Sequence, residues 1–228
     1  MRFPRLLAST AVAALIMGAS GSASAQNIPF DLTATATVTS DYLFRGISQT
    51  AGDPAFQASL EAGMENGFFF GVWGSNVDFG PTSDADYEVD LYVGYANEIG
   101  DFSYTAKALY YVYPGTGSED LDYVEVGVDL AYTVAWATYG VSAYWTPDYS
   151  GNTGDAWYLA YSTDVALSEQ FTFSVGVGWN GFEEGDHYLN STVGVAYSYE
   201  DWVVDVTYSL TDRTATPNKW VLTVSKSF

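Results

Sequence analysis

The chain has 228 residues, no cysteine, and 28 Asp and Glu against 7 Lys and Arg, for a formal net charge of −21 at pH 7. This charge argues against nucleic acid as a partner, because nucleic-acid binding needs a basic surface. The lack of cysteine excludes disulfides and thiolate metal sites. Although 48% of the residues are hydrophobic, no apolar run beyond residue 25 approaches the roughly 20 residues of a membrane-spanning helix.

The first 25 residues have the pattern of a secretory signal peptide. Arg2 and Arg5 form a basic start, residues 6–17 an apolar core, and Ala23-Ser24-Ala25 an A-x-A cleavage site. The alternative is an N-terminal membrane anchor, for which this apolar run is short. We therefore expect cleavage after residue 25 and one mature domain, residues 26–228, whose size suits an all-β barrel.

Taken in chain order, residues 32–47 form the first alternating segment, and residues 54–79 contain the clearest hairpin signal. Asn66-Gly67 lies between two alternating runs, and this dipeptide favours a two-residue type I′ loop. Such a loop would pair Leu60 with Trp73 and, because side chains alternate along a strand, would place both on one uncharged face.

Further alternating segments continue to the C-terminus, and turn-forming residues separate them. The connections between segments are alternately short turns and longer Gly-, Pro- and Asp-rich loops. An even number of strands joined in this way is typical of an outer-membrane barrel. The sequence therefore predicts an all-β, twelve-stranded antiparallel up-and-down transmembrane barrel, with both termini at the short-turn, periplasmic end. Besides the first segment and the two of the hairpin, the predicted strands are residues 87–97, 102–113, 123–133, 138–146, 155–165, 171–180, 188–197, 202–210 and 219–228.

A secreted soluble barrel or sandwich is the alternative, and the two faces of the strands distinguish the possibilities. The only charge in the predicted outward set is Lys226, close enough to the terminus to reach the membrane interface. Shifting every strand by one residue would move Glu61, Asp90 and Lys107, among others, into lipid. A basic residue at the bilayer midplane costs about 2–4 kcal/mol and an acid somewhat less. In a bilayer the strands must also close, because an open edge leaves backbone groups unpaired.

The last strand alternates down to a terminal Phe228. Such an ending resembles the signal read by the barrel-assembly machinery, although Lys226 stands where an aromatic or apolar residue is usual. We therefore expect this machinery, outer-membrane lipid and lipopolysaccharide as partners, together with small solutes or ions.

A family resemblance is carried by residues 40–50, which read Ser-Asp-Tyr-Leu-Phe-Arg-Gly-Ile-Ser-Gln-Thr. With Pro54-Ala-Phe-Gln57 and Tyr87-Glu-Val-Asp-Leu-Tyr-Val-Gly-Tyr95, this segment resembles the TorF family of Gram-negative porins. The resemblance extends through essentially the whole mature chain. It implies a location in the outer membrane of a Gram-negative cell. It supplies no catalytic or ligand residues, because the family is itself assigned by its barrel character.

Motifs for catalysis, cofactors and metals are weak. His187, the only histidine, lies in an acidic loop without a Gly-x-Ser-x-Gly turn, so we expect no enzymatic activity. Gly176-Val-Gly-Trp-Asn-Gly181 matches a dinucleotide motif in letters alone, since it ends a strand and opens no helix, and no cofactor is expected. Acidic residues in the longer loops could gather Ca²⁺ or Mg²⁺, but they lack the spacing of a known metal-binding loop, so a solvated acidic rim is favoured.

The inward face contains the candidate site, since charges of both signs there indicate either structural ion pairs or a wet pore wall. The lumen of a twelve-stranded barrel is wider than that of an eight-stranded barrel, which side chains fill, and narrower than that of a sixteen-stranded porin, which is an open channel. We favour a narrow, water-filled, cation-preferring porin for small solutes or ions, with a closed structural or adhesin-type barrel as the alternative. Lys107 is expected opposite Tyr92, with Glu125 or Asp129 approaching from the next strand. The candidate lumen-lining residues are Asp41, Arg45, Glu61, Glu88, Asp90, Lys107, Glu125, Asp129 and Asp205, with Lys219 as a further cation. The inward rings expected to narrow the lumen are Phe68, Phe70, Tyr92, Tyr111 and Tyr144.

Overall fold

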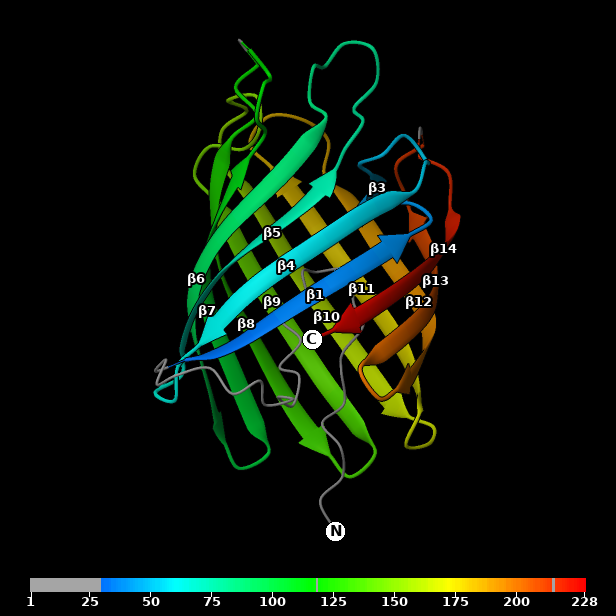
Figure 1. Cartoon of the computed structure of the whole chain (residues 1–228). Coiled ribbons are helices and arrows are strands. Elements are labelled where there is room, and N and C mark those ends of the chain that lie inside the picture. The colour runs from blue at the N-terminus through cyan, green and yellow to red at the C-terminus, as the bar shows by residue number, and fades with distance from the viewer. Residues whose placement is uncertain (1–29, 118, 215) are drawn as a thin grey trace.

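Twelve antiparallel strands form a closed barrel, as predicted (Figure 1). The computed structural model describes residues 30–117, 119–214 and 216–228, so the predicted signal peptide lies outside the described residues. Neighbouring wall strands follow one another in sequence, and β1 closes the barrel by pairing with β14. The wall strands are β1 (Asp31–Thr39), β4 (Ala55–Gly63), β5 (Phe68–Asn76), β6 (Tyr87–Ile99), β7 (Phe102–Val112), β8 (Tyr123–Val134), β9 (Ala137–Thr146), β10 (Ala156–Ala166), β11 (Phe171–Phe182), β12 (Tyr188–Tyr199), β13 (Trp202–Thr211) and β14 (Lys219–Ser227).

The first strand is shorter than predicted, because β1 ends at Thr39 rather than continuing to residue 47. The chain then leaves the wall and forms a separate two-stranded hairpin of β2 (Leu43–Phe44) and β3 (Ile47–Ser48). Its two-residue turn consists of Arg45 and Gly46, whose φ angles are 49° and 85°. Positive φ at both positions is the signature of a type I′ turn. A side chain with positive φ is uncommon and is found mainly where the surrounding structure holds it.

The loop after β4 contains three residues rather than the predicted two. The Gly67 N–H donates to the Met64 carbonyl at 3.0 Å, and Gly67 has a φ of 93°. Asn66 does not have the positive φ that a type I′ turn requires. A left-handed glycine at the end of a three-residue loop is the second common way to close a hairpin.

This extra loop residue reverses the predicted faces of β5. Leu60 pairs with Val72 instead of Trp73. Because side chains alternate, a shift of one residue turns every side chain of the strand to the other face. Trp73 therefore lines the interior. Of the three consecutive rings at the start of β5, the outer two are exposed and the middle one is buried, opposite to the prediction: these are Phe68, Phe69 and Phe70.

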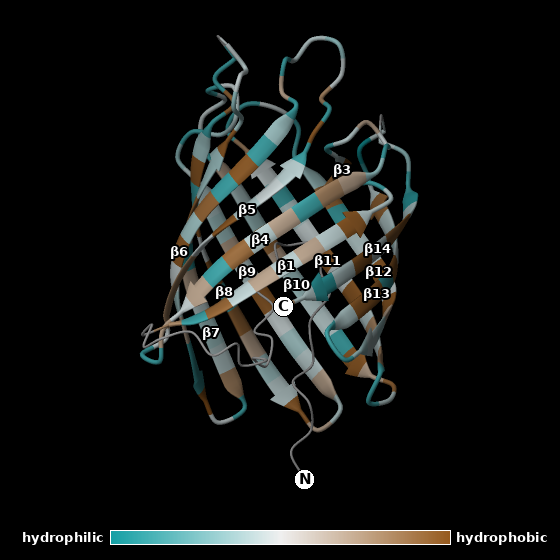
Figure 2. Ribbon diagram, viewed as in Figure 1, coloured by the Kyte–Doolittle hydropathy of each residue, from teal (hydrophilic) through white to brown (hydrophobic). Residues whose placement is uncertain are grey.

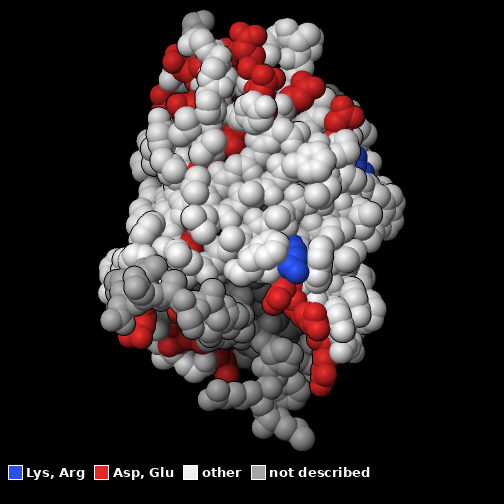
Figure 3. Space-filling model, in the orientation of Figure 1, with Lys and Arg blue, Asp and Glu red and all other residues white. Residues whose placement is uncertain are grey.

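The outer surface has a broad apolar belt between two acidic ends. Apolar and polar residues alternate along the wall strands (Figure 2), and on the face shown acidic side chains gather at the ends (Figure 3). Lys226 lies 4.9 Å from the ring centre of Trp202 and 5.2 Å from that of Phe228. This apolar belt fits the outward set expected from the sequence. In the described part of the chain, no helix is long and apolar enough to cross a membrane.

Inward-facing glycines give neighbouring aromatic rings room to lie against the wall. Gly127 is directly opposite Tyr144, and a side chain added at Gly127 would collide with that ring. Gly94 has the same relation to Phe69 across β5 and β6. Because these rings lie along the wall instead of crossing the lumen, space remains at the centre of the barrel.

Candidate functional site in the barrel lumen

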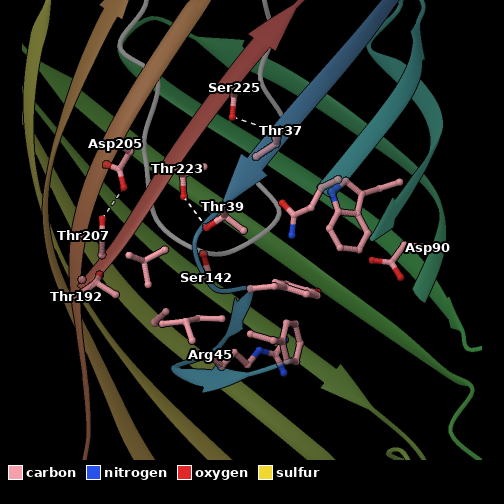
Figure 4. A pocket seen from close by; sticks show the side chains of 18 of the residues that line it. Thr37, Thr39, Arg45, Asp90, Ser142, Thr192, Asp205, Thr207, Thr223 and Ser225 are labelled. Carbon is pink, nitrogen blue, oxygen red and sulfur yellow. Dashed lines mark hydrogen bonds between the residues drawn. The ribbon is translucent and has the colours of Figure 1, made fainter. Parts of the chain in front are cut away.

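A cavity of about 370 Å³ occupies the lumen, and side chains from both sides of the barrel and from the β2–β3 hairpin line it (Figure 4). Its two sides differ in chemistry. One side, which we call the hydroxyl wall, consists of inward Ser and Thr residues on β1, β12, β13 and β14. The other, which we call the charged wall, carries inward charged residues on β6, β7 and β8. The hydroxyl wall contains Thr35, Thr37, Thr39, Thr192, Thr207, Ser209, Thr223 and Ser225, and the charged wall contains Glu88, Asp90, Lys107, Glu125 and Asp129.

The hydroxyl wall satisfies its polar groups largely within itself. Thr37 and Ser225 share a hydrogen bond of 2.9 Å across the seam between β1 and β14, and the Thr223 hydroxyl donates to that of Thr39 at 3.0 Å (Figure 4). A hydroxyl can both donate and accept, so such pairs need no charge. One acid belongs to this side: Asp205 lines the cavity and accepts a 2.7 Å hydrogen bond from Thr207.

On the charged wall, Lys107 forms an ion pair with Asp129 at 3.3 Å. Asp129 is one of the two partners that the sequence predicted for Lys107. Asp129 also accepts hydrogen bonds of 2.6 Å from Ser142 and from the Tyr144 hydroxyl. The predicted position of Lys107 opposite Tyr92 is wrong. Ile99 pairs with Phe102, so the turn is Gly100-Asp101, and this register places Lys107 between two glycines of the adjacent strands, Gly94 and Gly127.

The tip of the β2–β3 hairpin is held against the charged wall by Arg45. Its guanidinium donates to Glu125 at 2.5 Å and lies 4.2 Å from the ring centre of Tyr158. Tyr111 donates a second hydrogen bond to Glu125 at 3.1 Å. Burial alone would lower the pKa of Arg45, but the neighbouring Glu125 carboxylate raises it above its usual value. Arg45 therefore stays charged inside the lumen.

The base of the hairpin is fixed to the opposite side by Asp41. This carboxylate accepts 2.5 Å and 2.6 Å hydrogen bonds from Lys219 on β14 and from Ser48, and one of 3.1 Å from Thr50. Asp41 and Arg45 were predicted on the barrel wall, and this part of the prediction is wrong. The chain leaves the wall after β1, so both residues lie inside the barrel, on the segment that contains the β2–β3 hairpin.

The hairpin spans the lumen between these two attachments. At its tip, Gly46 lies so near β12 that an added methyl group would be 3.0 Å from the Cβ of Asn190. Phe44, beside the tip, packs against Tyr111 with ring centres 6.0 Å apart and joins a buried aromatic cluster. The hairpin therefore occupies part of the lumen and narrows it.

Two neighbouring acids on β6, Glu88 and Asp90, are buried on the charged wall. The Tyr42 hydroxyl donates to Glu88 at 3.3 Å. Burial, together with the nearby Glu88, raises the pKa of Tyr42 well above its usual value, so this phenol remains a donor. Glu88 Oε2 and Asp90 Oδ1 have no hydrogen-bond partner among the described residues. Glu61 on β4 also lines the cavity, as predicted.

Comparison with known protein families places the chain in one of them. The model of a family described as "Bacterial protein of unknown function (Gcw_chp)" matches residues 23–228. The chain belongs to the Gcw_chp family. This match does not confirm the TorF name. No curated protein sequence matches this Gcw_chp protein.

Solved porins share the fold of this Gcw_chp barrel. A KdgM porin aligns with a TM-score of 0.59 at 10% identity, covering 86% of this chain and 98% of the porin. A KdgM porin in complex with disordered oligogalacturonate aligns with a TM-score of 0.58 at 11% identity, covering 86% and 98%. A NanC porin aligns with a TM-score of 0.58 at 12% identity, covering 87% and 99%. Likeness at these identities establishes the fold alone.

Sequence reasoning missed one lumen acid of the Gcw_chp protein and the role of its hydroxyls. Asp164 on β10 is buried and accepts a 2.6 Å hydrogen bond from Ser174. Alternation from the outward Leu159 and Tyr161 would have placed Asp164 inside. The hydroxyl wall was signalled by alternating Ser and Thr in β1 and β14.

The single histidine of the Gcw_chp protein lies in a loop between β11 and β12. His187 Nδ1 accepts a 3.1 Å hydrogen bond from the Phe182 N–H, and its ring centre lies 5.6 Å from that of Trp179. Within residues 30–117, 119–214 and 216–228, no group of three or more His, Asp or Glu side chains is arranged to hold a metal ion.

Proposed function

We propose that the chain is an outer-membrane porin, a passive diffusion channel for small solutes or ions. The observation that carries this proposal is a cavity of about 370 Å³, with charged and hydroxyl-bearing side chains in its lining, inside a barrel with an apolar outer belt. Lipid outside and water inside favour this distribution in membrane barrels. The KdgM and NanC porins of similar fold support the proposal, as does the resemblance of residues 40–50 to TorF porins.

A preference for cations follows from the charges of the lumen. Among the described residues, three cations that face the interior are each paired with an acid: Arg45 with Glu125, Lys107 with Asp129, and Lys219 with Asp41. Further inward acids remain in excess of these pairs. Low-dielectric walls focus the field of such charges and raise the local concentration of the opposite ion. The acids left in excess are Glu61, Glu88, Asp90 and Asp164.

The same charge balance argues against a polyanionic solute. The oligogalacturonate bound in one KdgM structure is a chain of acidic sugars. An excess of inward carboxylates would repel such a chain, because like charges in a confined low-dielectric space are unfavourable. The solutes of this barrel are therefore small and neutral or cationic, and the β2–β3 hairpin limits their size.

Conductance of the purified barrel in planar lipid bilayers tests the proposal. Discrete current steps are expected, with a reversal potential in a KCl gradient that shows cation preference. Anion-selective steps would refute the preference. Silence from protein that is folded, as judged by altered gel migration without boiling, would favour the alternative, a closed structural or adhesin-type barrel.

The proposed location is the outer membrane, with the short turns and both termini in the periplasm after cleavage following residue 25. Lipid, lipopolysaccharide and the barrel-assembly machinery, which would read the strand ending in Phe228, are the proposed partners. Because the chain has no cysteine, single cysteines report orientation. Asn152→Cys and Gly185→Cys in the long loops should react with an impermeant reagent on whole cells, whereas labelling of Asn66→Cys would reverse the orientation.

A further inference from the structure

We propose that Asp90, together with Trp73 and Tyr111, forms a binding site for small organic ammonium cations in the lumen. This inference rests on the proposed porin function and narrows it by naming the class of solute. All three residues line the cavity. The register places Trp73 on β5 and Tyr111 on β7 directly opposite Asp90 on β6.

Asp90 is a buried acid that has no positively charged partner among the described residues. It is 4% exposed, and its Oδ1 has no hydrogen-bond partner among the described residues. None of the ion pairs within the described ranges includes Asp90. Its neighbour Glu88 also has an oxygen without a described partner. Because a buried carboxylate without a counter-charge is costly, a cation entering the cavity would stabilise this part of the wall.

The lumen already holds two cations by combining a carboxylate of the charged wall with an aromatic ring on β9 or β10. Arg45 pairs with Glu125 and lies 4.2 Å from the ring centre of Tyr158. The ammonium of Lys107 pairs with Asp129 and lies 5.2 Å from the ring centre of Tyr144.

Asp90 likewise has aromatic residues, Trp73 and Tyr111, opposite it in the register, but it forms no ion pair with a cation of the described chain. Aromatic faces attract ammonium groups, and Trp does so best. The two filled arrangements therefore indicate what the third would bind.

The chemistry favours an organic cation over a divalent metal. Ca²⁺ takes six to eight oxygen ligands and Mg²⁺ a near-ideal octahedron, whereas the described residues contain no metal-holding group of three His, Asp or Glu side chains. A cavity of about 370 Å³ lies within the range of small-molecule sites. Figure 4 shows Asp90 among the side chains that surround this space.

Isothermal titration calorimetry of the full, folded barrel in detergent tests the site with butylammonium and tetramethylammonium chloride. Saturable binding is expected for both, with none for sucrose and much weaker binding for KCl. Asp90→Asn should weaken ammonium binding by about tenfold or more, because a hydrogen bond or ion pair to a charged group is lost. The matched control is Asp205→Asn, the same change in the same cavity on the hydroxyl wall, which should alter binding by less than about twofold.

Binding that survives Asp90→Asn, or falls equally in Asp205→Asn, would overturn the proposal. If Asp90→Asn does not fold, Trp73→Leu provides the second test and should weaken tetramethylammonium binding several-fold. Unchanged binding in folded Trp73→Leu would likewise count against the site. Calorimetry does not require transport. A barrel that binds ammonium but shows no conductance would therefore refute the proposed porin function and leave the binding site standing. A conducting barrel without ammonium binding would refute the site alone.

Discussion

The hydroxyl wall and the charged wall fill the inside of one barrel in different ways. Pairs such as Thr37 with Ser225 satisfy each other across the β1–β14 seam without any charge. Arg45 and Lys107, in contrast, are each held by a carboxylate of the charged wall and by an aromatic ring on β10 or β9. The difference indicates a division of labour. The charged wall holds the hairpin through Arg45 and Glu125, whereas the hydroxyl wall presents a row of Ser and Thr side chains to the cavity.

The largest expected effect comes from removing the charge that joins the hairpin to the charged wall. Arg45→Gln should lower the free energy of unfolding by about 3–5 kcal/mol, because it leaves a buried carboxylate unpaired. Glu125 is only 2% exposed. Conductance should rise as the hairpin loses its attachment. Urea unfolding and bilayer recordings measure the two effects.

Two further variants sharpen this test. Arg213→Gln removes a loop arginine that lies 5.2 Å from the ring centre of Tyr188, and it should cost no more than about 1 kcal/mol. Replacing the pair together, Arg45→Met with Glu125→Leu, should recover much of the stability, because apolar residues of similar volume often replace a buried ion pair well. If Arg45→Gln and Arg213→Gln lower the free energy of unfolding equally, the buried pair of Arg45 with Glu125 has no special role in stability.

A smaller effect is expected for the second ion pair of the charged wall. The Asp129 side chain is 31% exposed and keeps its bonds from Ser142 and Tyr144 when Lys107 is replaced. Lys107→Gln should therefore cost about 1 kcal/mol or less while increasing cation selectivity in a KCl gradient. A sharply lowered unfolding temperature would show instead that this part of the lumen is dry and closed.

A comparably small change in stability is expected on the hydroxyl wall. Thr223→Val breaks one hydroxyl pair with Thr39, and a hydrogen bond contributes about 0.5–1.5 kcal/mol net. Single-channel conductance should fall, because an apolar group replaces part of the wet surface. Val224→Thr, the reciprocal change on the next, outward-facing residue, is the control and should conduct like the parent. If both variants conduct alike, solutes do not follow this wall.

The sequence was sufficient to predict the twelve wall strands and most of their faces. Alternation imposed by lipid on one side and water on the other is a local signal, and it correctly placed Glu61, Asp90 and Lys107 inside. It failed at β5, where the extra residue of the three-residue loop reversed the faces. Asn66-Gly67 is compatible with either loop length, so the dipeptide alone does not determine the register.

The lumen hairpin could not be predicted because its determinants are distant in sequence. Residues 40–47 continue the alternation of β1, so a local pattern extends the strand. What turns the chain inward are contacts such as Lys219 with Asp41, 178 residues apart, and Arg45 with Glu125, 80 residues apart. The positive φ of Arg45 has no compositional signal, since Asn, Asp and Gly are the usual residues at such turns.

The seam between the first and last strands determines when the interior can be completed. β1 cannot pair with β14 until the end of the chain is available, and contacts of such long sequence separation form slowly. The hairpin follows β1 directly, yet Lys219, which holds its base, belongs to the strand made last. An assembling barrel must therefore enclose the hairpin as its sheet curls, before the seam closes and seals the side of the barrel. The segment that narrows the lumen is thus secured by the final step of folding.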